Sequence, residues 1–101
     1  MEKRKPNYLL SEVLAIVAAN RIDAFTQTAL HGAWELGLTS EGAVGVVLGL
    51  RQSNFHKSMT THTDHHIWQD VYHADLESGL RVYIKLTLRE NGIVVIQFKE
   101  K

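Results

Sequence analysis

The feature that most constrains this fold is a strictly alternating stretch near the C-terminus, Val82-Tyr83-Ile84-Lys85-Leu86-Thr87-Leu88. Its even-numbered positions are apolar, and its odd-numbered positions are polar or amphipathic. A period of two predicts a β-strand, because successive side chains of a strand point to opposite faces of the sheet. The stretch therefore predicts a strand that buries one face only.

The loop after this strand, Glu90-Asn91-Gly92, sets the register of the next strand. A two-residue Asn-Gly turn would place Leu86 opposite Gln97 and bring polar groups onto the apolar face. Because a one-residue slip moves every side chain to the wrong face, we predict a three-residue loop with Gly92 in the left-handed conformation. The predicted pairs are then Leu88 with Val94, Leu86 with Ile96, Ile84 with Phe98, and Tyr83 with Lys99.

The preceding loop, Glu77-Ser78-Gly79, yields a second hairpin by the same reasoning. Its predicted pairs are Asp75 with Arg81, His73 with Tyr83, Tyr72 with Ile84, and Trp68 with Leu88. The apolar face of the resulting sheet carries Trp68, Tyr72, Ile84, Leu86, Leu88, Ile96 and Phe98. The opposite face displays Gln69, His73, Tyr83, Lys85, Thr87, Gln97 and Lys99. We thus predict a C-terminal β-meander of three strands, Ile67–Asp75, Leu80–Arg89 and Ile93–Lys99.

The first half of the chain has helical periodicity instead. We predict one helix capped by Ser11, a second capped by Thr26 and ending before Gly37, and a third opened by Ser40. The polar segment from Arg51 to His66 is predicted to be a loop that leads to the strands. The predicted fold class is therefore α+β, with the N-terminal helices packed on one face of an antiparallel sheet.

Size and composition favour a single domain spanning residues 1–101. The hydrophobic fraction of 45% suits one core, and the absence of cysteine excludes disulfides and thiolate zinc sites. Eleven basic and eleven acidic side chains cancel, so global charge gives no indication of a nucleic-acid partner. The charged N-terminus precedes no signal-peptide pattern, and no apolar run reaches the ~20 residues of a membrane span. We expect a cytoplasmic protein without membrane contact.

Several segments together resemble one known family. They are Met1-Glu2-Lys3-Arg4, Trp34-Glu35-Leu36-Gly37-Leu38, Phe55-His56-Lys57-Ser58-Met59-Thr60-Thr61, Asp64-His65, Ile67-Trp68-Gln69-Asp70-Val71-Tyr72 and Phe98-Lys99-Glu100-Lys101. The chain closely resembles the MqsR family of type II toxins, whose fold is RelE-like. The resemblance implies a ribosome-independent mRNA interferase that cuts single-stranded mRNA at short sites such as GCU. It also implies a cognate antitoxin similar to MqsA, with zinc-binding cysteines and a helix-turn-helix segment.

The resemblance also implies the site residues. The family's catalytic lysine, glutamine, tyrosine and second lysine fall on Lys57, Gln69, Tyr83 and Lys99. Candidates for substrate binding are His56, His73 and Lys85. His56 stands where family members carry a tyrosine, and an imidazole there could still stack on a base or move a proton. Lys85 could instead be a solvated neighbour of the site.

The predicted register leaves one tension at Gln69. Gln69 faces Thr87, whereas His73 faces Tyr83. Gln69 and His73 are four residues apart, which is ~13 Å along their strand. Either a bulge shortens this distance, or Gln69 binds a flanking nucleotide.

These residue types suit metal-independent cleavage of RNA to a 2',3'-cyclic phosphate and a 5'-hydroxyl. Lys57 and Lys99 would stabilise the charged transition state, Gln69 would orient phosphate or base, and Tyr83 beside Lys99 could assist a proton transfer. The general base stays open among Lys57, Tyr83, His56, His65 and His73. We expect no metal or cofactor.

Two other classes of function remain as alternatives. A catalytically inactive module that binds RNA or an antitoxin would have no reason to keep all four catalytic residues. A zinc hydrolase built on His62-x-Asp64-His65-His66 is disfavoured, because this stretch is predicted to be a loop without the helical spacing that a ligand pair needs.

Overall fold

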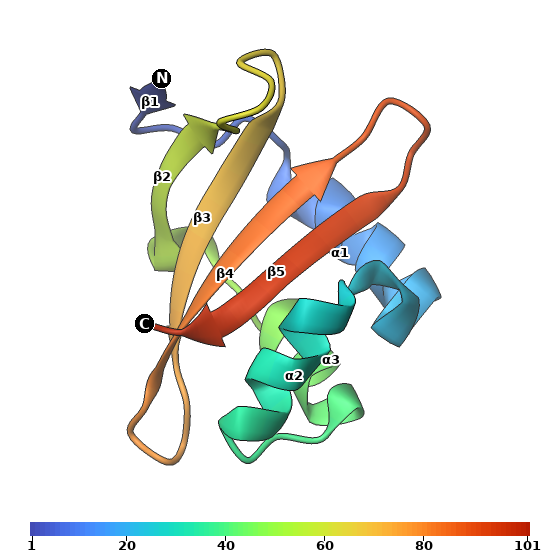
Figure 1. Ribbon diagram of the computed structural model, residues 1–101, viewed down its shortest axis with the longest axis vertical. Helices are drawn as coiled ribbons and strands as arrows, with labels where there is room; N and C mark the ends of the chain where they lie inside the picture. The colour runs from blue at the N-terminus through green and yellow to red at the C-terminus, as the bar shows by residue number, and fades with distance from the viewer.

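The computed structural model describes the whole chain, Met1 to Lys101. In order along the chain the elements are β1 (Glu2–Lys3), α1 (Leu10–Asn20), α2 (Gln27–Glu35), α3 (Ser40–Leu48), β2 (Phe55–Thr60), β3 (Trp68–Asp75), β4 (Arg81–Leu88) and β5 (Val94–Glu100), with 3-10 turns at Arg21–Ala24 and Gln52–Asn54. The strands form one five-stranded antiparallel sheet in chain order. In Figure 1, α1 lies behind this sheet and α2 lies beside β5. The α+β prediction is confirmed. None of the helices is long and apolar enough to cross a bilayer.

The predicted registers of both hairpins are confirmed. Leu86 pairs with Ile96 and Tyr83 with Lys99, as the three-residue loop requires. In the other hairpin Tyr83 pairs with His73. The glycine that ends each loop has a positive φ, 91° at Gly79 and 83° at Gly92. Only glycine adopts this conformation without strain, which is why each loop can place a third residue and keep the apolar positions on one face.

The apolar face of the sheet packs on the helices to form the core. Its largest buried side chains are Tyr72, Ile84, Leu86, Ile96 and Phe98. They share one cluster with Val13 and Val17 of α1 and with Val44 and Val47 of α3. The helices therefore cover one face of the sheet and leave the opposite face open.

The prediction of a loop across Arg51–His66 is wrong for part of this segment. Residues Phe55–Thr60 form β2, and the two residues of β1 pair with its end. Strand β2 lacks an apolar face, because Ser58 and Thr60 point toward the core although they are polar. Burial of Ser58 is possible because its hydroxyl donates to the Asp70 carboxylate at 2.7 Å. Because the inward-facing residues Ser58 and Thr60 are polar, this segment lacks the alternation of apolar and polar residues that predicts a strand.

Two predicted helix caps also differ from the structure. Ser11 caps nothing, because α1 begins at Leu10 and has no side-chain cap. At α3 the cap is Thr39, whose hydroxyl accepts from the Gly42 amide, so Ser40 is the first helical residue. The predicted cap of α2 is confirmed, since Thr26 accepts from the Ala29 amide.

Helix α2 reaches the edge of β5 only because residue 32 is glycine. A Cβ at Gly32 would lie 2.3 Å from the Phe98 carbonyl oxygen, a backbone atom that cannot move aside alone. We expect Gly32→Ala to lower the free energy of unfolding by about 1–3 kcal/mol, as overpacked sites do. Denaturant unfolding measures the change.

The matched control is Gly45→Ala in α3. No atom lies within 4 Å of a Cβ at Gly45, so alanine there should stabilise the helix by about 0.5–1 kcal/mol. Equal effects of the two substitutions would contradict the close approach of α2 to β5.

Candidate active site

The open face of the sheet, here called the site face, carries most of the predicted site residues in two rows across the strands. One row runs from Lys57 on β2 through Val71 and Lys85 to Gln97. The next row runs from His73 through Tyr83 to Lys99. Neighbouring strands lie ~4.8 Å apart, and Lys85 on β4 is two strands from Lys57 on β2 and one strand from Lys99 on the edge strand β5.

Tyr83 lies beside two lysines. The ammonium nitrogens of Lys85 and Lys99 are 5.6 Å and 5.7 Å from the centroid of its ring. Neither lysine forms an ion pair or a side-chain hydrogen bond within the protein. The three side chains line a cavity of about 360 Å³, together with Gln97 and the first turn of α2. A phenol and two unpaired cations thus open onto a space that suits an anionic ligand.

Lys57 lies on a strand and not, as predicted, on a loop. Its ammonium contacts the Glu2 carboxylate at 2.7 Å, and the Lys57 side chain is only 24% exposed. The hydrogen bond and the positive charge of Lys57 lower the pKa of Glu2. A phosphate that binds Lys57 must therefore share it with Glu2 or displace the Glu2 carboxylate.

Lys85 is partly buried, and its part in substrate binding stays a prediction. Val71 lies between Lys57 and Lys85 in the ladder and is 0% exposed, although it belongs to the site face. Long lysine side chains can cover an apolar residue in this way while their charged ends stay near solvent. Burial, followed by the charges of Lys99 and Lys57, lowers the pKa of Lys85.

Two histidines stack next to Tyr83. The rings of His56 and His73 lie 4.4 Å apart at 25°, and the His73 ring is 5.4 Å from the Tyr83 ring. Desolvation lowers the pKa of both histidines, and nearby positive charges, including Lys57, add to the effect. Both pKa values therefore fall below the usual value of about 6.5, which favours neutral imidazoles at pH 7. The Nε2 atom of His73 is buried without a partner.

A β-bulge places His56 in this stack. On β2, Phe55 pairs with Tyr72, and Lys57 pairs with Val71, the residue adjacent to Tyr72 on β3. His56 is therefore the extra residue of the bulge. Such a residue bends its strand and redirects its side chain. The bulge was not predicted from the sequence, because β2 itself was not predicted.

Gln69 is not brought next to Tyr83. The β3–β4 ladder is regular from Asp70–Leu86 to Asp75–Arg81, so no bulge shortens the distance between Gln69 and His73. Gln69 is also only 9% exposed, because the unexpected strand β2 sets Met59 beside it. Thr87, on the same face, is likewise buried rather than displayed. The structure therefore removes the first alternative, the bulge, and contact with a flanking nucleotide stays a prediction.

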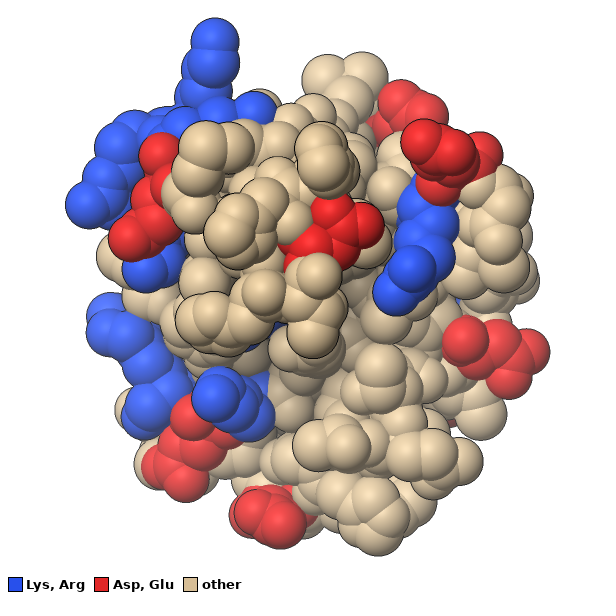
Figure 2. Space-filling view, turned by 45° about the horizontal axis from the view of Figure 1, so that its top comes forward, with Lys and Arg blue, Asp and Glu red and all other residues tan.

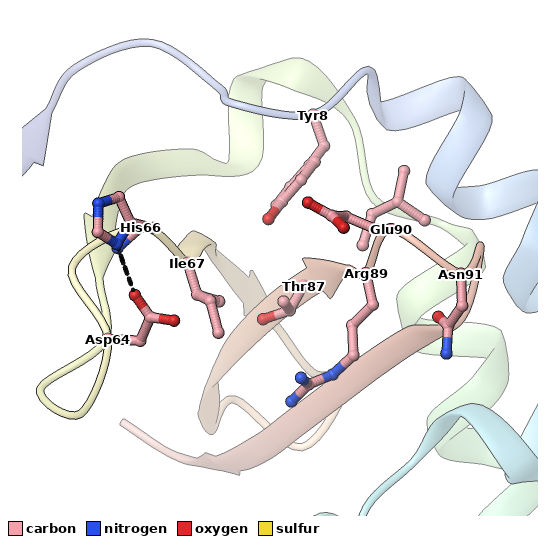
Figure 3. A pocket seen from close by; sticks show the side chains of 9 residues that line it. Tyr8, Asp64, His66, Ile67, Thr87, Arg89, Glu90 and Asn91 are labelled. Carbon is pink, nitrogen blue, oxygen red and sulfur yellow. Dashed lines mark hydrogen bonds and ion pairs between the residues drawn. The ribbon is translucent and has the colours of Figure 1, made fainter.

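A second cavity, of about 610 Å³, lies at the other end of the sheet (Figure 3). Its lining includes Tyr8, Arg89, and the pair His66 and Asp64, whose side chains are 3.1 Å apart. His65 is exposed in the loop between β2 and β3. No three His, Asp or Glu side chains of this loop converge as metal ligands. The absence of a catalytic metal stays a prediction.

Asp70 is a residue that sequence reasoning missed. It is 1% exposed and lies on the core face, where its carboxylate accepts from the amides of Asn7 and Tyr8 and from the Ser58 hydroxyl. These bonds hold the N-terminal segment, and with it Glu2, against β2. An acid at an apolar position of a predicted strand was the available signal, because a buried carboxylate needs partners.

Charge on the surface is unevenly distributed although the chain is neutral overall. Figure 2 shows most of the visible Lys and Arg side chains along the left side of the molecule, where some acidic side chains lie among them, while other Asp and Glu side chains are scattered over the rest of this face. A local group of cations attracts phosphate without a basic protein as a whole.

Comparisons with known proteins identify the family of the chain. A sequence model of the family described as "Motility quorum-sensing regulator, toxin of MqsA" matches residues 5–100. Over 101 residues, the chain is 46% identical to the mRNA interferase toxin MqsR of Escherichia coli (strain K12), and the match covers 100% of both chains. The resemblance seen in the sequence is thereby confirmed: the chain belongs to the MqsR toxin family.

Proposed function

We propose that this protein is an mRNA interferase toxin, an endoribonuclease that cuts single-stranded mRNA without the ribosome at short sites such as GCU. The observation that carries this proposal is the cavity at Tyr83, where Lys85 and Lys99 approach one ring without a carboxylate partner. Unpaired cations on an open face suit a phosphodiester. The full-length similarity to an mRNA interferase toxin supports the same chemistry.

The proposed roles follow the charges and the positions of the side chains. Lys57 and Lys99 stabilise the negative charge of the pentacoordinate phosphate. Tyr83, beside Lys99, assists a proton transfer. The cut leaves a 2',3'-cyclic phosphate and a free 5'-hydroxyl, because the 2'-oxygen of the substrate is the nucleophile.

Substrate recognition is assigned to residues that flank Lys57, Tyr83 and Lys99. The His56 ring, stacked on His73, offers a flat surface for a base next to the cut site. Gln69 contacts a nucleotide that flanks the cut site. On the sheet, the row that contains Val71 and Lys85 separates Gln69 from Tyr83. The general base is one of Lys57, Tyr83, His56 and His73; exposed His65 lies outside this group.

A cognate antitoxin is the second proposed partner. The family description, a toxin of MqsA, supports an antitoxin of that kind. We expect this antitoxin to carry zinc-binding cysteines and a helix-turn-helix segment, as the resemblance implies. Coexpression of the toxin with the product of the adjacent gene, followed by copurification, tests this partner.

Cleavage of a single-stranded RNA with and without EDTA tests the function. We expect equal rates in both conditions and cyclic-phosphate ends in the products, because the proposed chemistry uses only side chains. Gel analysis gives the rates and mass spectrometry gives the ends. Loss of activity in EDTA would indicate a metallohydrolase, and the absence of cleavage in both conditions would indicate an inactive binding module.

A further inference from the structure

The proposed cleavage lacks one component, the acid that protonates the departing 5'-oxygen. An alkoxide is a poor leaving group, so a positioned proton donor accelerates its departure by about 10²–10⁴-fold. Lys57 and Lys99 are assigned to the charge of the phosphate, and they do this best while they keep their protons. Tyr83 stands among the candidates for the general base, so a further donor on the site face is needed.

On the site face, Lys85 has a neighbouring strand on each side. It lies on β4 between Val71 and Gln97, in the row that begins at Lys57. It lines the 360 Å³ cavity together with Tyr83 and Lys99, and its ammonium is 5.6 Å from the Tyr83 ring centroid. No carboxylate or carbonyl of the protein accepts its protons. All its donors are thus available to a ligand in the cavity.

The surroundings of Lys85 favour the release of a proton. Its partial burial disfavours the ammonium, and the positive charges of Lys99 and Lys57 disfavour it further, so the pKa lies below the usual lysine value. An ordinary lysine is protonated at neutral pH, and a general acid requires that form. Loss of its proton relieves repulsion with the other two lysines.

The neighbouring alternatives fit this role less well. The Nε2 atom of His73 is buried under other rings, so it cannot reach a substrate oxygen. The lowered pKa of His56 favours an imidazole that is already neutral and has no acidic proton to give. Lys57 already contacts Glu2.

We propose that Lys85 is the general acid of the cleavage, an assignment that rests on the proposed function. As the 2'-oxygen forms its bond to phosphorus, the bond from phosphorus to the 5'-oxygen breaks, and its electron pair goes to that oxygen. The 5'-oxygen takes a proton from the Lys85 ammonium and leaves as a hydroxyl. The 2'-hydroxyl proton goes to the general base, and the neutral Lys85 amine is reprotonated by water.

Two substitutions and two substrates test this role. Lys85→Met keeps most of the aliphatic side chain over Val71 but removes the proton donor. Lys85→Arg keeps the charge, but the guanidinium does not release its proton. On RNA we expect both variants to cleave about 100-fold or more slowly than the wild type. On an RNA with sulfur in place of the 5'-oxygen at the cut site, most of this loss should disappear, because a thiolate leaves without protonation.

Lys99→Ala serves as the contrast. This variant should cleave both substrates slowly, because Lys99 stabilises the charge of the phosphate and does not protonate the leaving oxygen. Lys5→Ala, on the exposed N-terminal segment, controls for a general loss of positive charge. Near-wild-type cleavage of RNA by Lys85→Arg would show that only charge matters and would overturn the assignment. Equal losses of Lys85→Met on the two substrates would also overturn it. A wild-type protein that cuts neither substrate would instead refute the proposed function, and the assignment with it.

Discussion

Replacing Lys57 or Lys99 with alanine is expected to slow RNA cleavage by about 100-fold or more and to leave the fold intact. The positions of both lysines on the sheet are set before the substrate arrives, that of Lys57 by its place on β2 and that of Lys99 by its pairing with Tyr83. Preorganised charge of this kind lowers the barrier because it does not have to reorganise during the reaction. Single-turnover cleavage rates measure the effect.

Thermal unfolding provides the control for this prediction. Lys99 has no partner in the protein, and Lys57 has only a partly exposed contact with Glu2, so neither substitution should change stability by more than about 1 kcal/mol. Lys5→Ala should leave both stability and cleavage unchanged. Wild-type rates after the loss of Lys57 or Lys99 would refute this active site.

The fold was predictable wherever apolar and polar residues alternate. Strands β3, β4 and β5 follow from Val82–Leu88 and from two loops that end in glycine, because only one register keeps Leu86 on the apolar face. Strand β2 was not predictable in this way. Its inward side chain Ser58 is polar and depends on Asp70, a partner that only the folded chain brings near.

The site was predictable in part, and for two separate reasons. The pairing of Tyr83 with Lys99 follows from the register alone, whereas the catalytic roles come from the family resemblance. The contact between Glu2 and Lys57 joins residues from opposite halves of the sequence, which no local pattern indicates. The burial of Lys85 likewise depends on strands on both sides of β4.

Asp70 connects the core to this site. Its carboxylate holds the amides of Asn7 and Tyr8, and the Tyr8 hydroxyl adds a hydrogen bond of 2.7 Å to the Trp68 carbonyl. The same segment supplies Glu2, which pairs with Met59 on β2 and contacts Lys57. One buried acid thus helps to place Glu2, the partner of the proposed catalytic residue Lys57.

Asp70→Ala should therefore have the largest effect on stability. The substitution leaves three donors, the Asn7 and Tyr8 amides and the Ser58 hydroxyl, without their acceptor. Each unsatisfied buried donor costs about 1–3 kcal/mol, and the N-terminal segment can recover part of this by moving into water. We expect a loss of roughly 3 kcal/mol and a fall in Tm of about 12–24 °C, measured by denaturant and thermal unfolding.

Two comparisons show whether the buried hydrogen bonds are the cause. Asp64→Ala removes a largely exposed carboxylate that bonds only near the surface, so it should change the free energy of unfolding by no more than about 0.5 kcal/mol. Asp70→Asn keeps one acceptor oxygen and should fall between the wild type and Asp70→Ala. Limited proteolysis should cut the first eight residues faster in Asp70→Ala than in the wild type, because that segment loses its anchor on the sheet. An Asp70→Ala protein as stable as Asp64→Ala would mean that the N-terminal segment is held by other contacts and that Asp70 does not link it to the site.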